Sequence, residues 1–365
     1  MKKIITLCAL LSSMTLTTIA FSEPRSIGES RTLNSKILGK EKSIQVYLPA
    51  ETGHPDQKFP VLYLLHGQWD MLPAVATLDL IATTVPEFMV VGIDSRGPEL
   101  NVSDGADTFA RFLQLELFPL IEEEYPAADY RILSGHSHAG KFVMHQWLMD
   151  ALPLTQYFAF SPSLDDGYLL DKIQRLPNAK DIQLKPLTLT MASEGEHMYT
   201  PYTKIESLLK GNSGFLFSSS HFPEESHRST KHPSLKFALQ ESFPEWAPSG
   251  PVKMSGAAGI KKHYDTLSNR YGLSALPSIE MLQQITARYS VGGSPESHAK
   301  LQPMFHYALR DLNVSAAPFV EIVDYLTENG YTEASSIYLA ALCRTEDSID
   351  RCRTMPPNQQ RKNIE

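Results

Sequence analysis

Short apolar runs that alternate with amphipathic segments constrain the fold of this chain more than any other feature. In chain order, the runs are FPVLYLLHG (59–67), FMVVGID (88–94), YRIL (130–133), YFAFSPS (157–163), LTLTMAS (187–193) and FLFSSSHF (215–222). Continuous apolar strands are typical of parallel sheets that are buried on both faces. Helical spacing of apolar residues between the runs supplies the crossover helices. The sequence therefore predicts an α/β fold with a mostly parallel central sheet and helices on both faces.

Three further segments complete this prediction. Residues 31–48 alternate apolar and polar side chains around Gly39, as a β-hairpin does. Helical patterns cover residues 72–84 and 107–125. The predicted order is thus a hairpin followed by alternating strands and helices.

The character of the chain changes near WAPSGP (246–251), beyond which the strand runs end. Helices are predicted to begin at Ser278 and Ser294, which are good N-caps. We predict a domain over 23–247 and a helical C-terminal extension over 248–365. The last helical hairpin, about 317–342, weakly resembles a tetratricopeptide unit, but one hairpin is no repeat array. The extension is expected to pack on the domain, to form a homo-oligomer or to contact another protein.

Residues 1–22 have the pattern of a signal peptide. Lys2 and Lys3 precede an apolar run, and Ala20-Phe21-Ser22 places small residues at a cleavage site. The run is too short and too rich in Ser and Thr for a comfortable membrane span. The sequence predicts a periplasmic or secreted protein that is cleaved near Ser22.

The charge and the cysteines restrict the partners and the compartment. The net charge of −8 becomes −10 when the predicted signal peptide is removed, and no basic cluster is present. Such a chain is a poor candidate for binding nucleic acid or anionic membranes. Cys343 and Cys352 lie close together and could form a disulfide in an oxidising compartment.

Ser137 lies in the segment GHSHA (135–139), after the apolar run 130–133 and before an apolar helical pattern. A serine hydroxyl is a weak nucleophile until a base removes its proton. In a nucleophile elbow, a sharp strand-to-helix turn lifts the serine above the sheet, and the residues two before and two after it must be small. Gly135 and Ala139 meet this requirement. The motif therefore predicts Ser137 as a catalytic nucleophile.

Two backbone N–H groups are expected to stabilise the oxyanion that forms when a serine attacks an ester. One is that of His138, which follows the nucleophile at the positive end of a helix. The other belongs to Gly67 or Gln68, in the loop after an earlier strand. Trp69 and Asp70 come next, either in an ordinary loop or at the entrance of the pocket.

His227 is the predicted general base. It lies in FPEESHRS, a loop after the last strand, and in this kind of fold the histidine follows the nucleophile and the acid. His221 is still within the strand run, and His232 begins the next segment. His136 and His138 flank the serine too closely to take its proton, so one is expected to pack and the other to line the pocket mouth.

The identity of the acid that orients this histidine stays open. Glu194 and Glu196 follow the run LTLTMAS, which is the expected place for such a carboxylate, and Glu196 is slightly favoured. Asp165 or Asp166, one strand earlier, is a third option. A backbone carbonyl could also hold His227 without any acid.

Five segments together resemble the putative-esterase branch of the α/β-hydrolases, which includes esterase D, enterobactin esterase, feruloyl esterases and mycolyltransferases. They are ILGKEKSIQVYLP, FPVLYLLHG, YRILSGHSHAG, AFSPSL and FPEESHRS, and the resemblance covers about residues 25–245. It implies the α/β-hydrolase fold, with Ser137 as nucleophile and His227 as base, and it supports Glu194 or Glu196 as the acid. The tail from Pro251 onward resembles the helical extension of some secreted bacterial members.

Two departures from the family pattern blur the subfamily. His66-Gly67 stands where Asp-Gly is common, and Ala139 replaces a common glycine. The expected function is nevertheless a secreted serine esterase that hydrolyses small-molecule carboxylic esters through an acyl-serine intermediate, with no cofactor and no metal. The alternatives are a serine peptidase or acyltransferase on the same fold, or a non-catalytic binding protein that uses the helical tail.

Overall fold

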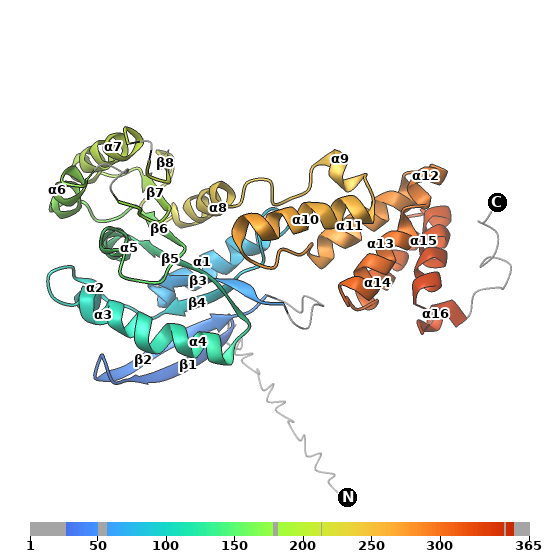
Figure 1. Cartoon of the computed structure of the whole chain (residues 1–365), viewed down its shortest axis with the longest axis horizontal. Helices are drawn as coiled ribbons and strands as arrows, with labels where there is room; N and C mark the ends of the chain where they lie inside the picture. The colour runs from blue at the N-terminus through green and yellow to red at the C-terminus, as the bar shows by residue number, and fades with distance from the viewer. Residues whose placement is uncertain (1–26, 50–56, 178–181, 213, 347, 354–365) are drawn as a thin grey trace, which may run out of the picture.

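The computed structural model describes residues 27–49, 57–177, 182–212, 214–346 and 348–353 (Figure 1). The predicted signal peptide, 1–22, lies outside these residues. No helix within the described ranges is both long enough and apolar enough to cross a membrane.

An eight-stranded sheet with the order β1-β2-β4-β3-β5-β6-β7-β8 forms the centre of the N-terminal part (Figure 1). The strands are β1 (Glu29–Ser35), β2 (Lys40–Tyr47), β3 (Phe59–Leu65), β4 (Met89–Ile93), β5 (Ala127–His136), β6 (Gln156–Phe160), β7 (Leu187–Ala192) and β8 (Phe217–Phe222). β2 pairs antiparallel with β1 and β4, whereas the strands from β3 to β8 pair in parallel. This arrangement confirms the predicted hairpin and the mostly parallel sheet.

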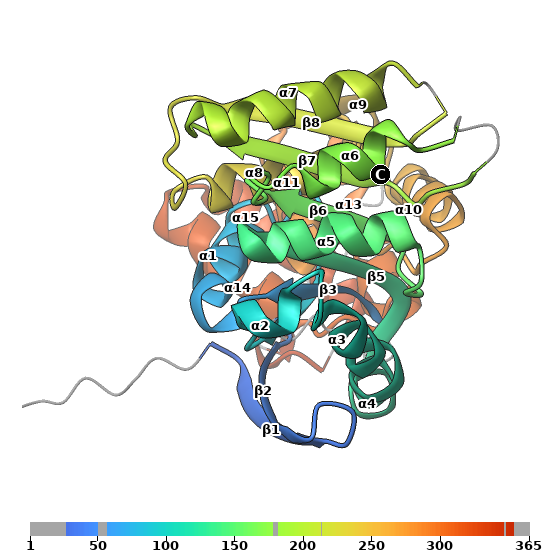
Figure 2. The ribbon, with the colours of Figure 1, turned by 90° about the vertical axis from the view of Figure 1, so that its left-hand side faces the viewer.

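Helices cover both faces of the sheet (Figure 2). α1 and α8 pack on one face, and α3 to α7 pack on the other. The helices are α1 (Gly67–Leu80), α2 (Gly97–Leu100), α3 (Ala106–Phe112), α4 (Phe118–Glu124), α5 (His138–Met149), α6 (Tyr168–Gln174), α7 (Glu196–Lys210) and α8 (Lys231–Ser242). The predicted helix 107–125 is present as α3 and α4 joined by a π-helical turn, η1 (Leu113–Leu117). The predicted helix 72–84 begins earlier, at Gly67.

Strand β3 illustrates why fully apolar runs form this sheet. Leu62 and Leu64 point to the core beneath α1 and α8, whereas Val61, Tyr63 and Leu65 point to the core on the opposite face. Successive side chains of a strand alternate between faces, so a strand covered on both sides has no position for a charged residue. The apolar runs of the sequence are therefore the central strands.

The described part of the chain beyond α8 is helical. Its elements are α9 (Gly250–Lys253), α10 (Ala257–Tyr271), α11 (Ile279–Val291), α12 (Pro295–His298), α13 (Leu301–His306), η2 (Tyr307–Asp311), α14 (Ala317–Glu328), α15 (Thr332–Thr345) and α16 (Asp350–Arg353). Ser278 caps α11 and Ser294 caps α12 through their side-chain oxygens, as predicted. Cys343 and Cys352 form a disulfide that ties α15 to α16.

The C-terminal helices share a hydrophobic core with the sheet. Phe158 on β6, Ile260 on α10 and Tyr338 on α15 belong to one continuous cluster of buried residues. Trp246 joins the two regions, because its ring packs edge-on against both Phe243, directly after α8, and Tyr264 of α10. The extension is thus packed against the sheet domain.

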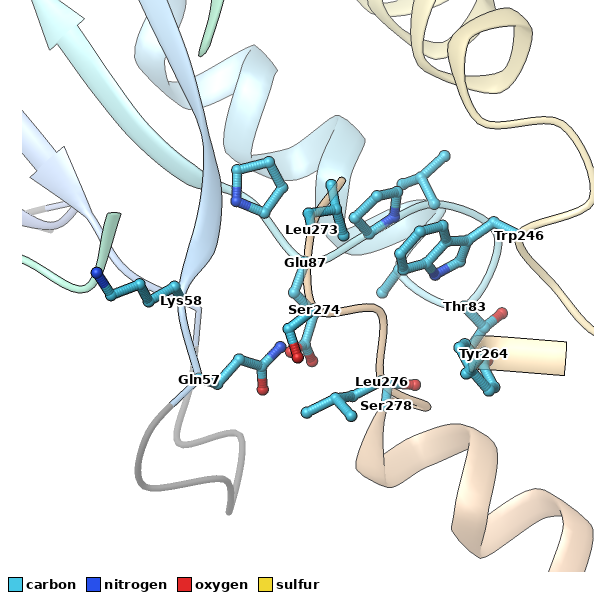
Figure 3. A pocket seen from close by; sticks show the side chains of 14 residues that line it. Gln57, Lys58, Thr83, Glu87, Trp246, Tyr264, Leu273, Ser274, Leu276 and Ser278 are labelled. Atoms are coloured by element: carbon cyan, nitrogen blue, oxygen red, sulfur yellow. The ribbon is translucent and has the colours of Figure 1, made fainter. Parts of the chain in front are cut away.

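A small polar cavity lies at this junction (Figure 3). Gln57, Glu87 and Ser274 line it together with the rings of Trp246 and Tyr264. Burial raises the pKa of Glu87 to about 7, against the weaker opposing effect of its hydrogen bond with Gln57. When the Glu87 carboxyl group loses its proton, its negative charge is therefore buried at the junction, which is unfavourable.

We expect Glu87→Gln to stabilise the protein at pH 8 by about 1–3 kcal/mol. The folded-state pKa is raised above the unfolded value of 4.5, so the contribution of Glu87 to stability is full below pH 4.5 and falls as the pH rises to about 7. The amide keeps the size of the side chain without the charge. Thermal melts at pH 4.5 and pH 8 measure the effect.

The exposed Glu241 on α8 supplies the matched control, because Glu241→Gln removes the same charge away from the junction. A Glu87→Gln variant whose stability relative to the wild type is the same at both pH values would contradict this expectation.

Candidate functional site

Ser137 occupies a strained turn between β5 and α5. Its backbone angles are φ 60° and ψ −123°, a conformation that residues other than glycine rarely adopt. Backbone hydrogen bonds hold the turn: the Ser137 N–H donates to the Phe160 carbonyl at 2.9 Å, and the Ser137 carbonyl accepts from Lys141 at 3.0 Å and from Ser163 at 3.1 Å. This is the geometry of a nucleophile elbow, and the strained residue is held by β6, by the loop after β6 and by the first turn of α5.

Close backbone contacts explain the small residues around this turn. A Cβ atom on Gly135 would lie 2.6 Å from the backbone carbonyl carbon and oxygen of Ala139. Gly67, after β3, is equally constrained, because its Cβ would lie 2.5 Å from the Gly92 carbonyl carbon on β4. A side chain at either position would collide with this backbone, so both turns require glycine.

Ser137 and His227 line the same cavity, although they lie far apart in the chain. The cavity has a volume of about 620 Å³. Its other lining residues come from the loop and helix after β3, the end of β5, the segment before α8 and the first residue of α8: His66, Gln68, Trp69, His136, Arg228 and Lys231. The structure thus brings the predicted nucleophile and the predicted base to one site.

A carboxylate lies behind His227. The Nδ1 atom of His227 is 2.5 Å from Oε1 of Glu194, at hydrogen-bond distance. Glu194 follows β7, and 13% of its side chain is exposed, compared with 44% of the His227 side chain. A carboxylate that accepts from Nδ1–H leaves the other ring nitrogen free to act as a base.

Glu196, which the sequence slightly favoured as the acid, lies elsewhere. Gly195 is the N-cap of α7, so Glu196 begins the helix and is exposed on its first turn. Its carboxylate accepts a hydrogen bond from the Thr200 hydroxyl at 2.8 Å. Of the other candidates, Asp166 pairs with Lys141 and Asp165 is exposed. The geometry therefore contradicts the ranking of Glu196 above Glu194.

His136 supports the loop that carries His227. Its Nε2 atom is 2.6 Å from the His227 carbonyl oxygen, and the two rings are 4.4 Å apart between centroids. Burial, together with the smaller effects of the nearby His227 and Lys231, lowers the pKa of His136 to about 3. The neutral ring therefore donates from Nε2–H to the carbonyl. Its neighbour His138 turns the other way, with Nε2 3.2 Å from the Gly97 carbonyl.

The three residues predicted for the oxyanion hole surround the elbow. Gln68 lines the cavity, and its side chain is fixed by hydrogen bonds with the backbone of Ser95: 2.8 Å to the carbonyl and 3.3 Å from the N–H. The backbone N–H groups of Gly67, Gln68 and His138 have no hydrogen-bond partner within the described ranges. Such free donors at helix N-termini are suited to an anionic oxygen.

Sequence reasoning missed the basic side chains of the site. Lys231 lines the cavity and forms an ion pair with Asp70 of α1, whose side chain is almost fully buried. Burial raises the pKa of Asp70, while the bond to Lys231 lowers it. Arg228 directly follows His227 and also faces the cavity. The FPEESHRS segment contains Arg228, but no spacing rule marks a cation in a loop as a cavity residue.

Part of the chain is similar to known proteins. Residues 35–175, less than half of the chain, match the family described as putative esterase. The predicted resemblance to the putative esterases is confirmed. An apo-salmochelin esterase from Escherichia coli (strain CFT073) is 28% identical over 145 residues, covering 32% of this chain and 45% of that protein. The match thus spans about half of the relative's length.

Solved structures agree on the fold. A crystal structure of an IroE-like serine hydrolase from Shewanella oneidensis superimposes with a TM-score of 0.62 at 20% identity, over 77% of this chain and 99% of the other. The siderophore hydrolase EstB from Aspergillus nidulans gives a TM-score of 0.53 at 20% identity, over 63% of this chain and 97% of the other. The α/β-hydrolase fold predicted from the sequence is confirmed, and the matches agree with the prediction of an enzyme that hydrolyses esters.

Proposed function

We propose that this protein is a serine ester hydrolase that cleaves carboxylic esters through an acyl-serine intermediate. The observation that carries the proposal is the common cavity of Ser137 and His227, with Glu194 at hydrogen-bond distance from the far side of the imidazole. A base that a carboxylate orients can activate a serine hydroxyl as a nucleophile. The family match and the related esterase support the same reaction class.

The proposed reaction uses each group in turn. His227 takes the proton of the Ser137 hydroxyl through Nε2 while Oγ attacks the ester carbonyl, and Glu194 accepts from Nδ1–H and stabilises the imidazolium. The His138 backbone N–H, together with that of Gly67 or Gln68, binds the oxyanion. His227 then gives its proton to the leaving alkoxide. A water molecule, activated by the same imidazole, hydrolyses the acyl-serine.

We also propose that residues 1–22 direct the protein to the periplasm or outside the cell. The disulfide between Cys343 and Cys352 supports an oxidising compartment, because structural disulfides are rare in the cytosol. The division into a hydrolase domain over 23–247 and a helical extension over 248–365 is part of the same proposal. N-terminal sequencing of the exported protein tests the cleavage after Ser22.

A fluorophosphonate probe is expected to label the folded protein on Ser137 only. Such probes react with a serine whose proton a neighbouring base can accept. Intact mass and peptide mapping identify the modified residue. Absence of labelling in the folded protein would favour the alternative of a non-catalytic binding protein, and hydrolysis of peptides in preference to esters would favour the peptidase alternative.

A further inference from the structure

The charged side chains that line the cavity around Ser137 are both cations, although the chain as a whole is acidic. Among its eight lining residues, Arg228 and Lys231 are cations and none is a carboxylate. The net charge of the chain is −8. A cleft lined by one sign of charge concentrates ligands of the opposite sign. The charged residues of the lining are therefore opposite in sign to the net charge of the chain.

Arg228 is the uncompensated charge in this cavity. Lys231 is neutralised by its ion pair with Asp70. Arg228 is exposed and has no ion-pair partner among the residues that the structure describes. Glu224 and Glu225 lie on the same loop, but neither lines the cavity. The guanidinium of Arg228 is thus available to a ligand.

Arg228 lies in the same cavity as the proposed reacting group. It directly follows His227 and lines the same cavity as Ser137. A guanidinium is a planar donor that binds a carboxylate through two parallel hydrogen bonds. A substrate bound at Ser137 with an anionic group next to its ester would meet this donor.

Trp69 adds an aromatic surface to the cavity. It lies on the first turn of α1 and is 58% exposed. Its ring meets the His66 ring edge-on, with 5.2 Å between centroids. An exposed indole at a cavity offers a face on which a flat ring of a ligand can pack.

We propose that the substrate is an aryl ester that carries a negatively charged group, with Arg228 binding the anion and Trp69 packing on the ring. The inference rests on the proposed serine esterase function and narrows its substrate class.

The test compares 4-acetoxybenzoate, which is anionic, with its neutral methyl ester, methyl 4-acetoxybenzoate. The measured quantity is the ratio of kcat/KM for the anionic ester to that for the neutral ester at pH 7.5. Arg228→Gln is expected to lower this ratio about tenfold, because a charge-assisted hydrogen bond is lost. Arg228→Lys keeps the charge but not the planar guanidinium, so it should lower the ratio less than Arg228→Gln does. Added salt should lower the wild-type ratio and leave that of Arg228→Gln nearly constant.

Arg288→Gln is the matched control. Arg288 is exposed on α11, so this variant makes the same change in net charge away from the cavity, and its ratio should equal that of the wild type. An equal ratio in Arg228→Gln and Arg288→Gln would overturn the role of Arg228. Trp69→Leu should raise KM for both aryl esters at least threefold, and an unchanged KM would overturn the role of Trp69. Turnover that persists without the Ser137 hydroxyl would instead refute the proposed function itself.

Discussion

Replacing Ser137 by alanine is expected to lower ester hydrolysis by about 10⁴-fold or more, to the level of the uncatalysed reaction plus residual oxyanion stabilisation. The substitution removes only the hydroxyl group. The strained backbone of residue 137 is held by main-chain hydrogen bonds to Phe160, Lys141 and Ser163, which an alanine also makes. The fold should therefore remain intact. Hydrolysis of p-nitrophenyl acetate, together with a thermal melt, measures both effects.

The control for this experiment is Ser163→Ala. The Ser163 N–H donates to the carbonyl of the elbow, and alanine keeps that bond while removing a nearby hydroxyl. This variant should retain wild-type turnover. Substantial hydrolysis by the Ser137→Ala protein would place the nucleophile elsewhere and remove the basis of the serine mechanism.

Replacing Glu194 by glutamine is expected to lower kcat about 10²–10⁴-fold with little change in KM. The carboxylate lies 2.5 Å from Nδ1 of His227 and balances the positive charge that the imidazole acquires in the transition state. An amide has nearly the same shape but no charge, and it can hold the ring in the wrong tautomer. The loss should therefore appear in the chemical step.

Glu196→Gln is the matched variant, because it makes the same chemical change two residues away. Its carboxylate contacts the Thr200 hydroxyl on the exposed side of α7, so kcat should stay within about threefold of the wild type. If Glu196→Gln proved the more damaging of the two, or if Glu194→Gln were harmless, His227 would be held by another group and Glu194 would not be the orienting acid.

The main features of the fold follow from the sequence because each depends on local physics. Apolar runs such as that of β3 are consistent only with strands covered on both faces, and the small residues at 135 and 139 reflect backbone contacts within a few residues. Helix boundaries were less predictable. α1 begins at Gly67 and contains Pro73 in its interior, a position that proline usually disfavours, so the helical pattern from residue 72 onward missed the start.

The choice between Glu194 and Glu196 could not be made from sequence because it depends on where a strand gives way to a helix. In a continuing strand, two residues separated by one position share a face. The chain instead turns at Gly195, which caps α7, and the two carboxylates point to different surroundings. The basic character of the cavity was missed for a related reason, because Lys231 and its partner Asp70 meet only after α1 and α8 have packed side by side.

Three imidazoles line the cavity, and two of them are chemically silent near neutrality. Burial lowers the pKa of His136 to about 3 and that of His66 to about 4, so both rings have lost their protons well before the range of about pH 5–8 in which histidines usually act. Although three histidines line the cavity, His66 and His136 are therefore not expected to add ionisations to the dependence of the rate on pH in this range. The neighbours shape the pocket without competing for the proton that catalysis has to move.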